Sequence, residues 1–183
     1  MKVATAKKIE ILPRPLKLDL GAGQNKREGF IGVDIAATSD LQADLFKFPW
    51  PFEDASVTEV HASHFFEHVP QNIRFKFMDE LWRILTVGGT ATFITPYYSS
   101  MRAIQDPTHQ WPPIAESSYL YFNKEWRKSN KLDHYDVKCD FDFSYGYIPD
   151  PESSLRNSET QAFWFKHYVN SILDLQVTLV KRA

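Results

Sequence analysis

Hydrophobic runs divide the first half of the chain into short strands and one helix. The strand candidates, each bounded by turn residues, are Leu16–Leu20, 30–35, Val57–Ser63 and 90–95. Between the last two, hydrophobic residues recur every four positions from Ile73 to Leu85, which predicts an amphipathic helix after Pro70. Gly88 and Gly89 are expected to stop this helix. A strand, a helix and another strand in this order are typical of a parallel sheet.

The second half of the chain has a different pattern. The expected elements are a long loop over 96–118, a short aromatic helix over 118–128, and strands over 135–143 and 173–179. Ser158 and Gln161 resemble a capping box, which predicts a helix from Ser158 to Asn170. Both strands alternate hydrophobic and polar residues, as antiparallel strands with one exposed face do. We therefore predict an α/β protein whose mainly parallel sheet is finished by antiparallel strands.

Composition narrows the class of protein. The chain has 183 residues, of which 43% are hydrophobic and 24% charged, so it is long enough to bury a core. We expect an arm over residues 1–15 and a single domain over residues 16–183. The net charge of −2 provides no overall positive field and disfavours binding to nucleic acid.

The cysteine count and the hydropathy pattern exclude further classes. Cys139 is the single cysteine, which excludes an intrachain disulfide and a multi-cysteine zinc or iron–sulfur site. No apolar run approaches the 18 residues or so that a membrane span needs. The first residues lack the apolar stretch of a signal peptide. We expect a cytoplasmic protein without a membrane partner.

A glycine turn carries the first candidate chemistry. The strand Leu16–Leu20 meets Gly21 and Gly23, where the missing Cβ lets the backbone approach a ligand. Asp34 ends the next strand, where a carboxylate can accept hydrogen bonds from both hydroxyls of a ribose. Asp44 could accept one from the amino group of an adenine.

The spacing of these residues disfavours NAD and FAD. Only 11 positions separate Gly23 from Asp34, and Asn25 occupies the place of the third glycine in a dinucleotide fingerprint. No complete helix fits in that interval, so no helix N-terminus is available for a pyrophosphate. A ligand with a ribose and an adenine but without phosphate fits better.

These motifs resemble those of one enzyme family. The segment Leu18-Asp19-Leu20-Gly21-Ala22-Gly23 is similar to motif I of class I S-adenosylmethionine-dependent methyltransferases. Four further segments match in the family's order: Gly29 to Asp34, Ala43-Asp44-Leu45, Ala62 to Val69, and Leu81 to Gly89. The resemblance covers residues 16–98 and is closest to a compact variant, similar to methyltransferase type 11, in which a loop replaces the first helix. It implies a Rossmann-like fold and S-adenosylmethionine as the cofactor.

The resemblance also implies roles for individual residues. The cofactor-binding candidates are Asp19, Gly21, Ala22, Gly23, Asp34, Ile35, Asp44, Leu45, Ser63 and His64. Two roles remain open for Asp19, which either fixes the glycine loop or contacts the amino group of the cofactor. The loop after the last matched strand is expected beside the methyl group. There, His109 is the candidate general base and Asp106 a candidate to orient it.

The sequence indicates the methyl acceptor less clearly than the cofactor. Residues 97–131 are expected to form an elaboration on the acceptor side, rich in aromatic residues that could stack on a flat or sugar-like molecule. The Asn/Asp-Pro-Pro-Tyr/Phe motif of amino-methylating enzymes is absent, because Thr95 precedes Pro96 and Tyr97 here. We therefore favour O-methylation of a small molecule or a saccharide over methylation of nucleic acid.

Two alternatives remain open. One is a nucleoside-binding module that keeps the fold without catalysis. The other is a zinc hydrolase, because His64-x-x-Glu67-His68 matches the inverted zinc-protease signature. The preceding strand and the following Pro70 leave little helix for such a pair, and no third ligand can be identified from the sequence. We therefore expect no metal ion.

Overall fold

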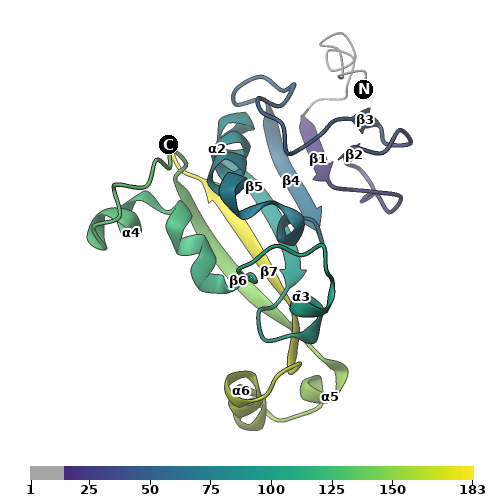
Figure 1. The fold of residues 1–183 in the computed structure, drawn as a ribbon, viewed down its shortest axis with the longest axis vertical. Coiled ribbons are helices and arrows are strands. Elements are labelled where there is room, and N and C mark those ends of the chain that lie inside the picture. Colours follow the sequence, from purple (N-terminus) through teal and green to yellow (C-terminus); the bar gives the residue numbers. More distant parts are fainter. Residues whose placement is uncertain (1–14) are drawn as a thin grey trace.

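The computed structural model describes residues 15–183, so the predicted N-terminal arm lies outside the described residues except for Pro15. A seven-stranded sheet with the order β3-β2-β1-β4-β5-β7-β6 forms its centre (Figure 1). The strands are β1 (Leu16–Leu20), β2 (Ile31–Asp34), β3 (Leu41–Gln42), β4 (Val57–Ser63), β5 (Leu85–Pro96), β6 (Phe141–Pro149) and β7 (Ile172–Lys181). Strands β1 to β5 pair in parallel, whereas β7 is antiparallel to both β5 and β6. The predicted fold class is confirmed.

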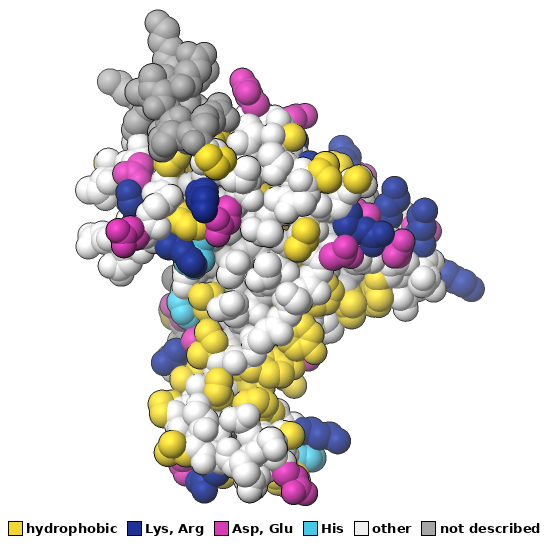
Figure 2. Space-filling view, turned by 180° about the vertical axis from the view of Figure 1, so that it is seen from behind, with side chains coloured by type: hydrophobic (Ala, Val, Ile, Leu, Met, Phe, Trp, Pro, Cys, Tyr) yellow, Lys and Arg dark blue, Asp and Glu magenta, His cyan; other side chains and the backbone are white. Residues whose placement is uncertain are grey.

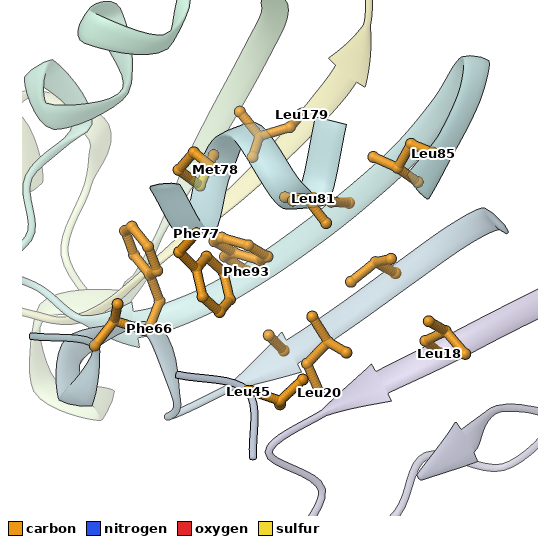
Figure 3. Close-up of a cluster of buried hydrophobic side chains, with 14 of the residues drawn as sticks. Leu18, Leu20, Leu45, Phe66, Phe77, Met78, Leu81, Leu85, Phe93 and Leu179 are labelled. Carbon is orange, nitrogen blue, oxygen red and sulfur yellow. The ribbon is translucent and has the colours of Figure 1, made fainter. Parts of the chain in front are cut away.

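The helices are short except for two. They are α2 (Arg74–Ile84), α3 (Met101–Gln105), α4 (Lys124–Ser129), α5 (Pro151–Ser154) and α6 (Ser158–His167), with 3-10 turns at Phe66–His68, Gln71–Ile73 and Glu116–Phe122. Phe77, Met78 and Leu81 point from α2 toward the sheet (Figure 3). They are fully buried, which explains the four-residue hydrophobic repeat in the sequence. None of the helices in the described part of the chain has the length and apolarity needed to cross a membrane.

The predicted stop of α2 is wrong. The helix ends at Ile84, and Gly88 and Gly89 lie inside β5. Leu85 already has extended backbone angles, and the pairing of β5 with β4 is irregular between Leu85 and Thr90. Gly88 has a φ of +75°. This backbone conformation belongs to the irregular part of the strand and not to a helix terminus.

The predicted strand over 135–143 starts too early, because β6 begins only at Phe141 and continues to Pro149. The backbone N–H groups of Lys138 and Cys139 donate to Oδ1 of Asp79, at 2.9 and 2.8 Å. The guanidinium of Arg127 donates to the carbonyls of Val137 and Cys139, at 3.2 and 3.0 Å. Since side chains satisfy this backbone, the segment needs no neighbouring strand.

Two predicted helices have different limits. The helix expected over 118–128 is a 3-10 turn followed by α4, and the side chain of Asn123 between them caps α4 at the N–H of Trp126. The helix expected from Ser158 to Asn170 ends at His167, and its N-cap is Asn157, not Ser158. The loop expected over 96–118 contains α3.

The segment between β1 and β2 has no helix. Residues 21–30 form turns that return directly to β2, as the compact methyltransferase variant implies. This short return brings the carboxyl ends of β1 and β2 together at one edge of the sheet. The carboxyl ends of β4 and β5 lie at the same edge, which is where open α/β sheets bind ligands.

Candidate active site

The glycine turn and the carboxylate of Asp34 face each other at this edge. Gly21 and Gly23 have φ values of +68° and +51°, in the left-handed region that glycine adopts without strain. The N–H of Gly23 donates to Oδ2 of Asp34 at 3.0 Å, and the N–H of Ala36 donates to Oδ1 at 2.9 Å. These two bonds fix the carboxylate, and each oxygen keeps a lone pair for a ligand.

Asp19, on β1, accepts a hydrogen bond from the loop that continues the glycine turn. Its carboxylate is buried, with Oδ2 accepting from the N–H of Arg27 at 2.7 Å and Oδ1 lying 2.7 Å from Nδ1 of His61. His61 occupies the paired position on β4. Both oxygens therefore have partners within the protein, which favours the loop-fixing role for Asp19 over a contact with the cofactor.

A small pocket adjoins Asp34. It has a volume of about 110 Å³ and is lined by Asp34, Ile35, Ala43, Asp44, Leu45, Phe46 and Phe65. The rings of Phe46 and Phe65 stack with their centroids 5.9 Å apart. Oδ1 of Asp44 accepts from the N–H of Phe46 at 3.1 Å, which orients its carboxylate. An apolar wall with one fixed carboxylate suits a flat heterocycle that carries an amino group.

A larger hollow of about 270 Å³ lies on the other side of the turn, lined by residues that include Ala22, Gly23 and Lys26. Asp40 stabilises this side, because its Oδ2 accepts from the N–H of Gly32 at 2.9 Å and from Nζ of Lys26 at 2.8 Å. Sequence reasoning missed Asp40, and no motif marks it.

Phe65 narrows the crevice beside the turn. A Cβ built on Gly21 would lie only 2.1 Å from Cδ2 of Phe65, so the aromatic ring lies directly on the glycine. The pocket beside Asp34 is smaller than the 300 Å³ or so of a typical ligand site. The ring thus occupies room that a nucleoside next to Gly21 would need. Sequence reasoning missed this contact, since it joins the segments that follow β1 and β4 through packing alone.

Ser63 and His64 follow β4 at the same edge. His64 is half exposed and has a φ of +53°, which is uncommon for a residue other than glycine and is frequent at functional sites. Its Nδ1 lies 3.5 Å from Oε1 of Glu67, and this carboxylate raises the pKa of His64. The structure therefore brings Ser63 and His64 to the edge that also holds the glycine turn.

Comparison with known proteins finds a matching family model for part of the chain. The model of a methyltransferase domain matches residues 9–93, which span the glycine turn, Asp34, Asp44 and His64. Over these residues, which make up slightly less than half of the chain, the sequence is similar to a methyltransferase domain. The segment matched by the family model contains the parallel strands β1 to β4 and most of β5. No curated protein matches the chain.

Solved structures support the methyltransferase fold. One is a SAM-dependent methyltransferase from Archaeoglobus fulgidus, 17% identical, with a TM-score of 0.65 over 96% of this chain and 90% of that one. Another is the YcgJ protein of Bacillus subtilis, 13% identical, with a TM-score of 0.53 over 97% of both chains. At these identities, the likeness extends to the fold alone.

S-adenosylmethionine is the cofactor that the sequence resemblance implies. Three features of the edge described above suit this cofactor: a turn with glycine at two positions, a fixed carboxylate at the end of β2 and an apolar pocket beside it. Of the predicted binding residues, Asp34, Ile35, Asp44 and Leu45 line one pocket, and Ala22 and Gly23 line the hollow next to it.

The loop after β5 brings both candidate catalytic residues to this edge. The N–H of Gln110 donates to the carbonyl of Glu67 at 2.9 Å, so the loop is docked on the segment after β4. Nδ1 of His109 lies 3.2 Å from the carbonyl of Ala103, and its Nε2 lies 3.7 Å from Oδ2 of Asp106. The Ala103 carbonyl orients the imidazole, while Asp106 lies beside the other ring nitrogen.

The zinc-protease pattern does not form the helix that it requires. His64 lies outside any helix, and Phe66–His68 is a single 3-10 turn. His64 and His68 are therefore not displayed one helical turn apart, as a pair of zinc ligands at positions i and i+4 would be. The geometry gives the zinc-hydrolase alternative no support.

Proposed function

We propose that this methyltransferase transfers the methyl group of S-adenosylmethionine to a hydroxyl group of a small molecule or a saccharide. The observation that supports this proposal most directly is that the Asp34 carboxylate faces the Gly21–Gly23 turn, at the edge where the His109 loop docks. When bound, S-adenosylmethionine supplies a methyl group activated by a positive sulfur, which a nucleophile displaces in line. The protein mainly aligns the two reactants, an effect that can contribute about 7–11 kcal/mol.

The residues of the edge have separate roles in this proposal. Asp34 accepts hydrogen bonds from the ribose hydroxyls, and Asp44 and Leu45 hold the adenine in the pocket that Phe46 and Phe65 line. Gly21, Ala22 and Gly23 let the backbone approach the amino-acid part, beside Ser63 and His64. Asp19 keeps the turn in place through Arg27.

His109 is the proposed general base. Its Nδ1 faces a carbonyl oxygen, which only accepts hydrogen bonds, so Nδ1 carries the proton and Nε2 has the free lone pair. Nε2 accepts the proton of the acceptor hydroxyl. Asp106 lies 3.7 Å from this nitrogen and stabilises the imidazolium that results. Hydrogen bonds from Thr108 lower the pKa of Asp106, which keeps that carboxylate charged.

The acceptor side of the proposal rests on residues 97–131. A groove of about 400 Å³ is lined by residues from this region, among them Pro112, Ile114 and Tyr121, together with Arg74. The Arg74 guanidinium donates to the carbonyls of Gln110 and Pro112 at 2.9 and 2.8 Å, which joins the groove to the His109 loop. Its volume and its aromatic walls suit a small flat or sugar-like molecule.

The surface gives less support to a nucleic-acid acceptor. Lys and Arg side chains lie among Asp and Glu side chains on the face that Figure 2 draws, and the net charge is −2. An acceptor recognised through its phosphates would favour a continuous basic surface.

The cytoplasmic location expected from the sequence stays a prediction.

His109→Gln is expected to lower methyl transfer by about 100-fold or more while leaving the affinity for S-adenosylmethionine unchanged, because general bases typically contribute 10²–10⁴-fold. Calorimetry with the cofactor and its demethylated product measures binding. Transfer of a radiolabelled methyl group to saccharide, small-molecule, protein and nucleic-acid pools identifies the acceptor class.

The matched control is His134→Gln, which changes an exposed histidine in the segment before β6. It is expected to behave as the unchanged protein. Absence of cofactor binding with the fold intact would refute the proposed function. Binding without transfer to any pool would favour the nucleoside-binding module instead.

A further inference from the structure

We propose that Glu67, His68 and His109 form a binding site for one divalent first-row transition-metal ion. One candidate ligand atom from each residue lies within 4.8 Å of the others. Two of the residues come from the turn after β4 and the third from the loop after α3. The imidazoles of His68 and His109 contact each other edge to face, with their centroids 4.8 Å apart. The docking bond from Gln110 to Glu67 holds the two segments together.

The hydrogen bonds around His68 fix its tautomer. The hydroxyl of Thr108 donates its single proton to Oδ1 of Asp106 at 2.6 Å. It can therefore only accept from Nδ1 of His68, which lies 3.1 Å away. Nδ1 of His68 thus carries the ring proton, and the lone pair of Nε2 is free to bind a metal ion.

His109 has the same arrangement. Its Nδ1 lies 3.2 Å from the carbonyl oxygen of Ala103, which can only accept. Both imidazoles are therefore held as the Nδ1–H tautomer by an oxygen partner. Such an oxygen behind each ring is the usual support of metal-binding histidines, because it orients the ring and increases the basicity of the ligating nitrogen.

Glu67 supplies an independent observation. Its residue is only 4% exposed, and neither carboxylate oxygen accepts a hydrogen bond from any side chain or backbone group within residues 15–183. Nδ1 of His64 lies 3.5 Å from Oε1 of Glu67. A buried carboxylate without donors is costly, and a bound cation supplies the missing positive charge.

The donor set points to the class of ion. Two imidazole nitrogens and one carboxylate suit zinc, manganese, iron or cobalt, whereas magnesium and calcium prefer oxygen ligands alone. Ligand atoms around a tetrahedral zinc ion lie about 3.4 Å apart. The ligand atoms, which lie up to 4.8 Å apart, would therefore approach one another by up to about 1.4 Å on binding. Three protein ligands leave a position open for another molecule.

A role of the metal ion in methyl transfer rests on the proposed function, whereas metal binding itself does not. If the acceptor hydroxyl that is proposed beside His109 took the open position, the metal ion would lower its pKa. With Nε2 of His109 bound to the ion, the proton leaves to water and the imidazole no longer serves as the base. The site differs from the zinc-hydrolase pattern, because His109 replaces His64 as a ligand.

The test is calorimetric titration of the untagged, chelator-treated protein with zinc chloride and with manganese chloride. We expect one ion per chain for at least one of them. Glu67→Gln and His68→Gln should each weaken binding by at least about 100-fold, whereas the control His134→Gln should not change it. Thr108→Val, which removes the oxygen behind His68, should weaken binding by about 10–100-fold, and Thr108→Ser should retain it.

Thermal unfolding of each variant shows whether it is folded. Absence of binding of both ions, or equal affinity in folded Glu67→Gln, would overturn the metal site. The titration with S-adenosylmethionine is separate from this one. If the cofactor binds and neither metal does, the proposed function survives without the metal site. If a metal binds and the cofactor does not, the metal site survives and the proposed function fails.

Discussion

Gly21→Ala is expected to lower the free energy of unfolding by about 2–5 kcal/mol. The left-handed backbone at this position costs a residue with a Cβ about 1–2 kcal/mol. The added Cβ would also lie 2.1 Å from the ring of Phe65, and overpacking of this kind costs about 1–3 kcal/mol. Denaturant unfolding of the full chain measures the sum.

Gly23→Ala is the matched control for this prediction. Gly23 has a similar φ of +51°, but a Cβ built there meets nothing within 4 Å. Its cost should therefore be limited to the backbone, about 1–2 kcal/mol. The variant Phe65→Ala with Gly21→Ala should recover the steric part of the loss, relative to Phe65→Ala alone. Equal losses at Gly21 and Gly23 would show that Phe65 does not lie on the turn in solution.

The first half of the fold could be predicted because its signals are local. The strands β1 and β4 match their predicted bounds, and the hydrophobic repeat from Ile73 to Leu85 marks the buried face of α2. Gly88 misled the prediction, since a glycine with a positive φ occurs in an irregular strand as well as at a helix terminus. One residue type thus supports two structures that only the pairing with β4 separates.

The second half depended on contacts that are distant in the sequence. Alternation over 135–143 is real, but Asp79, 59 residues before Lys138, binds the backbone of this segment and keeps it out of the sheet. Sequence patterns carry no record of such a bond. The exposed alternation of Asp136 and Lys138 is compatible with a strand and with an irregular segment alike, so the pattern alone could not decide.

In the candidate site, too, the sequence predicted what local signals determine and missed what depends on contacts distant in the sequence. The sequence predicted the meeting of Asp34 with the glycine turn because two adjacent parallel strands end at one edge. It did not predict the grouping of Glu67 and His68 with His109, which requires the loop after α3 to fold back onto the turn after β4. His109, the third proposed ligand, is 41 positions beyond His68.

Asp34→Ala is expected to weaken binding of S-adenosylmethionine by at least about 100-fold. A hydrogen bond to a charged group contributes about 1.5–3 kcal/mol, and this carboxylate is proposed to accept two from the ribose. The substitution also removes the acceptor that holds the N–H of Gly23, so the turn loses part of its preformed shape. Calorimetric titration with the cofactor measures the change in affinity.

Two further variants test whether the loss of affinity in Asp34→Ala is specific to the cofactor crevice. Asp133→Ala, an exposed carboxylate far along the chain, should leave the affinity unchanged. Asp44→Ala should cause a smaller loss, about 10-fold, because it removes one proposed bond to the adenine. Unchanged affinity in folded Asp34→Ala would place the nucleoside elsewhere. A large loss at Asp34 with a small one at Asp44 would support the proposed contacts, in which Asp34 accepts two hydrogen bonds from the ribose and Asp44 accepts one from the adenine.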